Sequence, residues 1–276
     1  MLLNSIKIND QEFVELKDII YRNSGIMFAE NKKYLLENRL SKRLADLNFT
    51  TFKDYIYYLK YDIKKRQELD ILINLVTINE TYFLRERGQL DYLVSNIVPD
   101  LIKAGKKSIK VWSAPCSTGE EPYSIAILLK NAGLFDKASI DIIATDINSE
   151  VVALAKKGEY RQASFRGVPA DFMRNFDVQG QSYFIKEDIK RHVRFNTGNI
   201  TTPAITSLIG KVDVIFCRNV LIYFDMDGKQ RTIKNFYNML TEPGYLCLGH
   251  SETLNKISED FAMKNAGTCI IYMKKK

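Results

Sequence analysis

A run of small and polar residues follows the apolar stretch Ile109–Trp112 and ends at the glycine that opens a helix-like stretch. The residues Ser113–Gly119 let the backbone turn sharply and approach a ligand closely. Free N–H groups at the start of the following helix favour a bound anion or carboxylate. Only Gly119 is a glycine, so the G-x-G-x-x-G fingerprint is absent and a dehydrogenase is disfavoured. Taken alone, the stretch suits a plain tight turn as well as a ligand site.

A single carboxylate follows the next apolar stretch. Asp146 comes directly after Ile140–Ala144 and Thr145, 27 positions beyond Gly119. An acidic residue at the end of a second strand is suited to hydrogen bonding with a ribose diol. The alternative is that Asp146 caps the helix that follows it. Together with the turn at Ser113–Gly119, this carboxylate favours a nucleoside-binding site over two unrelated local features.

The residues that commonly act as nucleophiles, bases or metal ligands are few and scattered. There are two histidines, His192 and His250, and four cysteines without a C-x-x-C pair. We therefore expect buried free thiols, no metal site and no Ser/His/Asp or Cys/His catalytic arrangement. His250 is better explained by a structural hydrogen bond in a loop than by catalysis, and His192 by a place on the surface or in a strand.

Strands and helices must position these residues, and from residue 109 onward the pattern alternates between the two. This alternation predicts an α/β fold, with a largely parallel, Rossmann-like sheet covered by helices on both faces. Asn148 or Ser149 is expected to cap one helix, Gly158 to end it, and Glu242–Gly244 to form a turn. The expected strands are 109–112, 140–144, 212–217, 245–248 and 270–273, and the expected helices are 121–131, 149–156 and 227–240.

Two segments depart from this alternation. Residues 10–75 have apolar residues at three-and-four spacing, as in Leu36–Leu40–Leu44–Leu47, and predict a small all-helical unit. Short runs at Tyr183–Ile185 and Val193–Phe195 predict a small antiparallel excursion. We thus expect a helical domain over 1–75, a linker and first helix over 76–108, and an α/β domain over 109–276 with a β insert at about 165–197.

Composition and charge narrow the class of protein. Hydrophobic residues make up 46% of the 276 residues, and no apolar run approaches the ~18 residues of a membrane span. The polar start of the chain does not resemble a secretory signal, so we expect a cytoplasmic protein without direct membrane insertion. The net charge of +7 is spread over the chain, with +2 in residues 1–75 and +5 beyond them. Such a diffuse surplus disfavours nucleic acid as a partner.

Five segments, in order along the chain, resemble the motifs of the chemotaxis receptor methyltransferases, the CheR family. The first resembles the family's linker motif, the second and third its two cofactor loops, the fourth its fourth-strand motif, and the fifth its signature near the C-terminus. The helical N-terminal unit is also similar to the family's layout. The segments are Val76–Arg85, Val111–Ser124, Ala144–Asn148, Phe216–Phe224 and Gly249–Glu252.

The resemblance implies a reaction. Members of the family transfer a methyl group from S-adenosylmethionine to glutamate carboxylates on the cytoplasmic helices of chemotaxis receptors, leaving glutamate methyl esters and S-adenosylhomocysteine. A glutamate with a pKa near ~4.3 is already ionised at neutral pH, so the nucleophile needs no general base. The enzyme must align the reacting atoms and exclude water. This demand agrees with the missing nucleophile–base arrangement.

The resemblance also implies roles for individual residues. Arg85 would meet the cofactor's carboxylate or the incoming glutamate, and Tyr223 would place a hydroxyl near the reacting centre, although Arg85 could instead be a solvated residue and Tyr223 a core aromatic. Either Glu120 or Glu121 would face the cofactor's ammonium, with Glu121 favoured. The other implied cofactor contacts are Asn79, Thr81, Asp146 at the ribose, Asn199 and Ile200 near the adenine, and Asn219 and Val220.

A short basic stripe lies in the helical unit. Lys32, Arg39 and Arg43 fall within a ~40° arc when a helix is drawn at ~100° per residue. A solvated helix face explains such a stripe, but in the resembling family a basic helix here meets acidic receptor helices, which suits charge complementarity. The β insert resembles the family's β-subdomain, which some members use to grip a receptor peptide; the compact segment around Gly180 disfavours that mode here.

Two other functions remain possible from the sequence. An RNA methyltransferase could use a similar sheet, but the diffuse charge and the lack of a recognised base-methylating motif disfavour it. A non-catalytic scaffold could keep the fold and bind receptors or cofactor, but the intact motifs at Asn79–Arg85, Asp146 and Asn219–Tyr223 disfavour it. The receptor glutamate methyltransferase is therefore the expected function.

Overall fold

The computed structural model describes residues 6–276, which divide into two compact units. One unit contains the chain up to Ile78 together with the short segment Tyr223–Gly228. The other contains Asn79–Ile222 and Lys229–Lys276. No helix among the described residues is long and apolar enough to cross a membrane.

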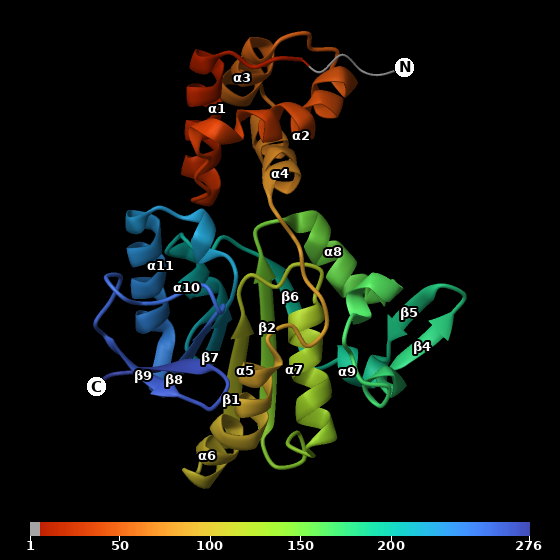
Figure 1. The fold of residues 1–276 in the computed structure, drawn as a ribbon, viewed down its shortest axis with the longest axis vertical. Helices are drawn as coiled ribbons and strands as arrows, with labels where there is room; N and C mark the ends of the chain where they lie inside the picture. Colours follow the sequence, from red (N-terminus) through yellow and green to blue (C-terminus); the bar gives the residue numbers. More distant parts are fainter. Residues whose placement is uncertain (1–5) are drawn as a thin grey trace. The chain divides into compact units, whose positions relative to one another are not determined.

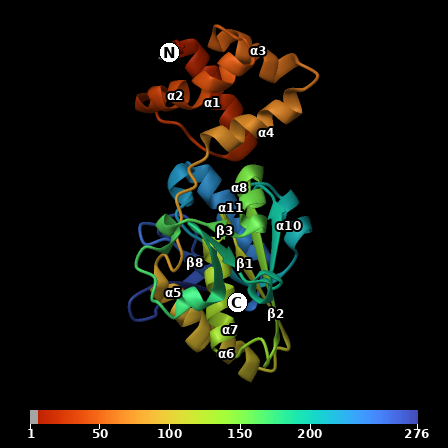
Figure 2. The same cartoon turned by 90° about the vertical axis from the view of Figure 1, so that its right-hand side faces the viewer.

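The first unit is built from helices, as the three-and-four spacing predicts (Figures 1 and 2). Its first helix starts at a capping box, in which Asn9 and Glu12 satisfy each other's backbone N–H groups, and ends at Gly25 in the left-handed conformation. The residues Leu36, Leu40 and Leu44 are fully buried. The helices are α1 (Asp10–Ser24), η1 (Glu30–Lys32), α2 (Lys33–Asp46), α3 (Phe52–Tyr61) and α4 (Lys65–Val76).

A buried ion pair fastens α2 to α4. The Arg43 side chain is 24% exposed and the Glu68 side chain 2%, and Arg43 Nε donates to Glu68 Oε1 at 2.9 Å. The Tyr55 hydroxyl from α3 donates to the same carboxylate at 2.9 Å. Nearby, Arg39 donates to the backbone oxygen of Val76. Two of the three residues in the basic stripe thus make contacts inside this unit, while Lys32 ends η1.

The second unit is an α/β domain around a seven-stranded sheet of order β6-β2-β1-β7-β8-β10-β9. The pairs from β6 to β8 are parallel, and β10 is antiparallel to both of its neighbours. All five strands expected from the alternation are present. The strands are β1 (Ser108–Ser113), β2 (Ser139–Asp146), β6 (Val193–Thr197), β7 (Val212–Cys217), β8 (Leu240–Leu248), β9 (Phe261–Asn265) and β10 (Ile270–Lys274).

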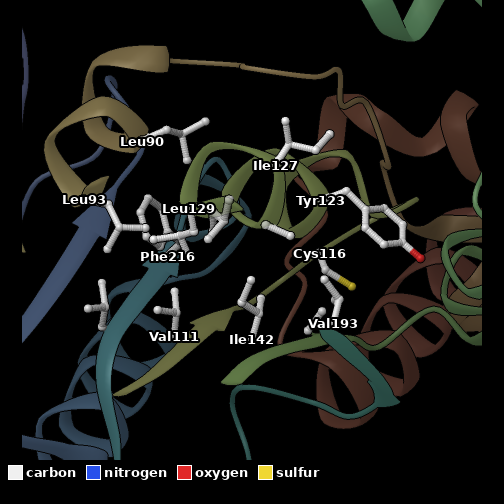
Figure 3. Packing of buried hydrophobic residues seen from close by; sticks show 14 of the residues in the cluster. Leu90, Leu93, Val111, Cys116, Tyr123, Ile127, Leu129, Ile142, Val193 and Phe216 are labelled. Carbon is white, nitrogen blue, oxygen red and sulfur yellow. The ribbon is translucent and has the colours of Figure 1, made fainter. Parts of the chain in front are cut away.

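Helices cover both faces of this sheet, because successive strand residues point to opposite sides. Val111 belongs to the buried cluster that includes Tyr123 of α7, whereas the next residue, Trp112, packs edge-on against Phe236 of α11. Figure 3 shows the first of these cores, between the strands and α7. The helices include α5 (Arg87–Tyr92), η2 (Leu93–Ile97), α6 (Val98–Lys103), α7 (Glu120–Asn131), α8 (Ser149–Lys157), α9 (Glu187–Lys190), α10 (Ala204–Ile209), η5 (Leu221–Tyr223) and α11 (Met226–Met239).

A small antiparallel sheet is present, but its extent differs from the predicted insert. It consists of β3 (Glu159–Tyr160), β5 (Ser182–Ile185) and β4 (Phe176–Gln179), with the last two beside α8 and α9 (Figure 1). The short run at Val193–Phe195 is not part of it: these residues form β6, which pairs parallel with β2. Alternation correctly indicated a half-buried strand there, but it could not indicate which sheet the strand joins.

The predicted ends of α8 agree with the structure, whereas the turn predicted before β8 does not. Asn148 caps α8 through its side chain, and Gly158 ends the helix with a φ of 66°. The residues Glu242–Gly244, expected as a turn before a strand, lie within β8 itself. The pairing of β8 with β7 shifts register across this stretch, so the turn residues form an irregular part of the strand rather than its boundary.

Removing Arg43 should destabilise the helical unit, because the Glu68 carboxylate would stay buried without its cation. We expect Arg43→Ala to lower the free energy of unfolding by about 3 kcal/mol. Urea denaturation followed by circular dichroism measures the change, and hydrogen exchange of the α2 and α4 amides assigns it to this unit. Arg22→Ala is the matched control, because its pair with Asp18 is exposed and should contribute under about 0.5 kcal/mol. Equal losses in the two variants would contradict the role given to the buried pair.

Candidate active site

The loops with the predicted cofactor residues follow the carboxyl ends of neighbouring parallel strands. The loop after β1 is tied to both flanking strands, since Ala114 N–H donates to the Phe216 oxygen at 2.8 Å and Cys116 N–H to the Thr145 oxygen at 2.9 Å. Carboxyl ends of parallel strands meet at one edge of an open sheet, where such folds bind ligands. The sequence segments around 113–119, 146 and 218–221 therefore meet at one site.

Asp146 organises the first loop. Its side chain is 4% exposed, and its oxygens accept hydrogen bonds from the N–H groups of Ser117 at 2.8 Å and Asn148 at 2.9 Å. Burial raises the pKa of this carboxyl, while the backbone donors oppose the rise. Asn148, not Asp146, caps α8, so the capping alternative for Asp146 is wrong. Each carboxylate oxygen can accept a further hydrogen bond, which leaves capacity for a diol.

Gly119 begins α7 at a position that only glycine fits. Its φ is 94°, and an added Cβ would lie 2.9 Å from the Ala155 Cβ and 3.0 Å from the Tyr160 hydroxyl oxygen. A side chain here would be strained in conformation and would clash with α8. The glycine therefore allows the loop after β1 to lie close to the last turn of α8.

The two glutamates at the start of α7 face different surroundings. Glu120 is buried and accepts hydrogen bonds from the Thr118 hydroxyl at 2.6 Å and the Ser164 hydroxyl at 3.0 Å; its burial raises its pKa. Glu121 accepts from the Ser113 hydroxyl at 2.6 Å, at the carboxyl end of β1. Glu121 is thus the one held at the strand ends, which supports the preference for it over Glu120 as the group facing a ligand cation.

Arg218 is a central residue of the site that the sequence reasoning missed. Its side chain is 3% exposed, and its Nε donates to Glu121 Oε2 at 2.5 Å. Its Nη1 donates to the backbone oxygen of Arg85 at 2.7 Å and lies 3.7 Å from Glu86 Oε2. The only signal for it was its place next to Asn219 in the Phe216–Phe224 segment. One guanidinium thus joins the strand-end loop, α7 and the linker segment.

Glu252 is a second central residue of the site that the sequence reasoning missed. Its carboxylate accepts four backbone hydrogen bonds, from the N–H groups of Asn219, Val220, Leu221 and Gly249, at 2.7 to 2.9 Å. Asn219 lies in the left-handed region with a φ of 59°, a conformation that costs energy outside glycine. The carboxylate therefore holds the loop that presents Asn219 and Val220, the predicted cofactor contacts. Its place in the Gly249–Glu252 segment was the only available signal.

The linker segment reaches the first loop through its backbone. The oxygen of Asn79 accepts a hydrogen bond from the Ser117 hydroxyl at 2.8 Å, and Phe83 packs among Tyr160, Phe165 and Phe176 of the insert. Thr81 is half-buried between these anchors. The Arg85 guanidinium lies over the Tyr82 ring and donates to the oxygen of Glu80 at 2.8 Å. Its contact with a ligand carboxylate stays a prediction.

The remaining predicted residues occupy other places. The Asn199 side chain closes a local turn by accepting from Thr201, and Ile200 is buried beside it. Gly198 N–H donates to the backbone carbonyl oxygen of Asp146 at 2.8 Å, which brings this segment to the end of β2. Tyr223 groups with the helical unit, where its backbone carbonyl oxygen accepts from Met27 N–H at 2.9 Å. The roles near the adenine and the reacting centre stay predictions.

The cysteines and histidines offer no nucleophile–base arrangement within the described part of the chain. All four cysteines are buried and free, as expected, and burial raises the pKa of the Cys116 and Cys217 thiols well above the usual value. His192 stacks on Phe135, and burial lowers its pKa. His250 is exposed. Across residues 6–276 there is no group of three His, Cys, Asp or Glu side chains that could hold a metal ion.

The carboxylate groups at the site fit S-adenosylmethionine. Glu121 lies where an ammonium could meet a carboxylate, and Asp146 has free acceptor capacity for a ribose. Glu86, whose buried Oε2 lacks a hydrogen-bond donor, adds negative charge beside Arg218. The acceptors therefore match the cationic and hydroxyl groups of this cofactor.

Several known proteins are similar to this chain. The chain is 37% identical to chemotaxis protein methyltransferase 2 of Vibrio cholerae serotype O1, over 95% of this chain and 92% of that protein. It is 35% identical to a chemotaxis protein methyltransferase of Borreliella burgdorferi, over 91% and 90%. Among solved structures, magnesium protoporphyrin IX methyltransferase of Synechocystis PCC 6803 with bound SAM aligns over 79% of this chain and 94% of that chain, with 16% identity and a TM-score of 0.38.

Two family models together match most of the sequence. The all-alpha domain of the CheR methyltransferases matches residues 11–77, which contain the four long helices of the first unit. The SAM-binding domain of the same methyltransferases matches residues 79–270, which contain Asp146, Glu121, Arg218 and Glu252. The chain belongs to the CheR methyltransferase family.

Proposed function

We propose that this chain methylates glutamate side chains on the cytoplasmic helices of chemotaxis receptors, with S-adenosylmethionine as donor, and that it acts in the cytoplasm in chemotactic adaptation. The products are glutamate methyl esters and S-adenosylhomocysteine. The names of its relatives, chemotaxis protein methyltransferases, support the substrate. The observation that carries the proposal is the pair of acceptors at the strand ends, Asp146 and Glu121, together with Glu86, which shares Arg218 with Glu121.

The reaction asks little of the protein's acids and bases. The cofactor supplies a methyl group on a positively charged sulfur. A substrate carboxylate oxygen forms the new O–CH3 bond while the CH3–S bond breaks, and its electron pair stays on sulfur, which becomes a neutral thioether. No proton moves, because the carboxylate is ionised at neutral pH. This agrees with the buried, protonated Cys116 and Cys217 and with the stacking of His192 on Phe135.

The protein's contribution is then binding and alignment. Glu121, held by Ser113 and Arg218, would face the ammonium of the cofactor's amino-acid end. Asp146, held by two backbone N–H groups, would accept from the ribose. Asn219 and Val220, fixed by Glu252, would line the pocket, with Asn79, Thr81, Asn199 and Ile200 as further contacts. Arg85 would meet either the cofactor's carboxylate or the incoming glutamate, and Tyr223 would place a hydroxyl near the reacting centre. Holding reactants in a near-attack geometry removes much of the barrier.

The receptor contact would use the basic stripe of the helical unit. Lys32 is exposed, and Arg39 keeps an unneutralised charge although it donates to the Val76 oxygen, whereas the charge of Arg43 is neutralised by the buried Glu68. An acidic helical segment of the receptor suits this charge. A peptide contact through the β insert is not part of the proposal.

Incubating the protein with labelled cofactor and membranes rich in chemotaxis receptors tests the proposed reaction. We expect label on the receptor that base treatment releases as methanol, because methyl esters hydrolyse under base. Asp146→Ala, lacking the proposed ribose acceptor, is the variant expected to lose transfer. Label transferred to RNA instead would indicate the RNA methyltransferase, and cofactor binding without any transfer would indicate the scaffold.

Exchanging each glutamate at the start of α7 tests which one faces the cofactor. Glu121→Gln should weaken S-adenosylmethionine binding about tenfold or more, because it removes the negative charge proposed to face the ammonium and replaces the ion pair with Arg218 by a weaker neutral-acceptor hydrogen bond. Glu120→Gln is the matched control and should change the affinity less than twofold, since the glutamine oxygen can still accept from one of the Thr118 and Ser164 hydroxyls while its NH2 group donates to the other. Isothermal titration calorimetry measures both. A larger loss in Glu120→Gln would reverse the assignment.

Reversing the charge of Arg39 tests the receptor contact. Arg39→Glu should lower the rate of receptor methylation at least fivefold at low ionic strength, while the affinity for S-adenosylmethionine stays within twofold. Lys17→Glu is a control elsewhere on the same unit, where the cation pairs with Glu30. Unchanged methylation in the Arg39 variant would leave the stripe as a solvated helix face.

A further inference from the structure

Glu86 occupies an unusual position for an acidic residue. It lies in the left-handed region with a φ of 51°, directly before α5. Its side chain is 9% exposed, and its Oε1 accepts a hydrogen bond from Asn219 Nδ2 at 3.2 Å. Its Oε2 is buried without any hydrogen-bond partner, 3.7 Å from Arg218 Nη1. A strained, buried and half-satisfied carboxylate costs stability, and such costs persist where function requires them.

The charges around Glu86 do not cancel. Arg218 is the cation that contacts it, and the same guanidinium is already bonded more closely to Glu121. Two carboxylates therefore share one positive charge, and the cluster keeps a net charge of −1. Glu252 cannot compensate, because it is itself an anion that backbone N–H groups satisfy. In a poorly hydrated site an excess charge acts over a longer range than it would in water.

We propose that Glu86 determines the specificity of the site for the cationic cofactor over the neutral product. S-adenosylmethionine carries a net charge of +1, because its sulfur is positive, whereas S-adenosylhomocysteine carries none. The uncompensated negative charge at Glu86 and Glu121 favours the first through space, without a direct bond from the shielded Oε2. The loss of the sulfur's charge during transfer removes this attraction, so the same residue promotes release of product. The inference rests on the proposed use of S-adenosylmethionine at this site.

The size of the effect follows from electrostatics. One unit charge acting over about 12 Å at an effective dielectric constant of about 20 changes an affinity about tenfold. Removal of the Glu86 charge should therefore lower the affinity for a cationic ligand about tenfold more than the affinity for a neutral one. A purely structural role would lower both affinities by the same factor, so the ratio separates the two roles.

The test measures dissociation constants by calorimetry for three ligands on the full chain. They are S-adenosylmethionine, S-adenosylhomocysteine and sinefungin, in which an ammonium group stands in place of the methylated sulfur. For Glu86→Gln we expect both cationic ligands to weaken about tenfold relative to S-adenosylhomocysteine. Sinefungin separates charge from the methyl group itself, because it is cationic but carries no sulfonium methyl.

Three further variants make the result decisive. Glu86→Asp keeps the charge and should keep the ratio of affinities within twofold of the unaltered protein. Asp91→Asn removes an exposed carboxylate paired with Arg87 on the adjoining helix and should also leave the ratio unchanged. Glu86→Ala gives the same ratio change as glutamine and replaces it if the glutamine variant does not fold. Thermal melting of the ligand-free variants identifies any loss of folding.

The outcomes distinguish this inference from the proposed function. If the unaltered protein binds none of the three ligands, the proposed cofactor use is wrong. If it binds them and the ratio stays within twofold in Glu86→Gln and Glu86→Ala, the role of Glu86 is overturned while the cofactor use stands. A change for S-adenosylmethionine but not for sinefungin would assign the effect to the methyl group and would also overturn the proposal.

Discussion

The candidate site depends on the buried guanidinium of Arg218. It is the group that simultaneously contacts the linker backbone at Arg85, the Glu121 carboxylate on α7 and the Glu86 carboxylate before α5. The Arg85–Glu86 segment, Glu121 and Arg218 are far apart in sequence, so a single planar cation with a fixed fork of donors fixes their mutual geometry. Lysine would offer a single nitrogen and could not serve three partners in one plane. The linker segment and the strand-end loops act as one site because of this residue.

Backbone strain is concentrated around the same place. Six residues other than glycine have a positive φ in the described part of the chain, and four of them are Leu84, Glu86, Ser117 and Asn219. Each lies in a segment that Arg218, Glu252 or Asp146 holds by hydrogen bonds. Carboxylates that accept several backbone N–H groups offset the conformational cost, because each charge-assisted bond is stronger than a neutral one. The buried acids of this site therefore shape the loops as well as offering acceptors to a ligand.

Much of this arrangement could be predicted from the sequence, and the exceptions have a common physical cause. Periodicity located the five expected strands and the helices of the first unit, and the small residues at Ser113–Gly119 correctly indicated the sharp turn between β1 and α7. Pairing partners could not be predicted in the same way. Val193–Phe195 was assigned to the wrong sheet because alternation describes one strand and not its neighbour. Arg218 and Glu252 were missed as organisers because their partners, Glu86 and the Asn219 loop among them, are brought to them only by the fold.

The difference between features of one segment and contacts made by the fold also explains why residue types alone did not indicate the proposed chemistry. A reaction that moves a proton requires a base. A base and the residue that orients it can be recognised in a sequence by their residue types, as in a Ser/His/Asp arrangement. Methyl transfer to an ionised carboxylate moves no proton, so selection acts on alignment and charge instead. Alignment is supplied here by loops that buried carboxylates hold through backbone N–H groups, such as the four bonds to Glu252. Charge is supplied by an excess of carboxylates over the one buried guanidinium. Both properties belong to the assembled site, which is why the residues that produce them become recognisable only once their partners are in place.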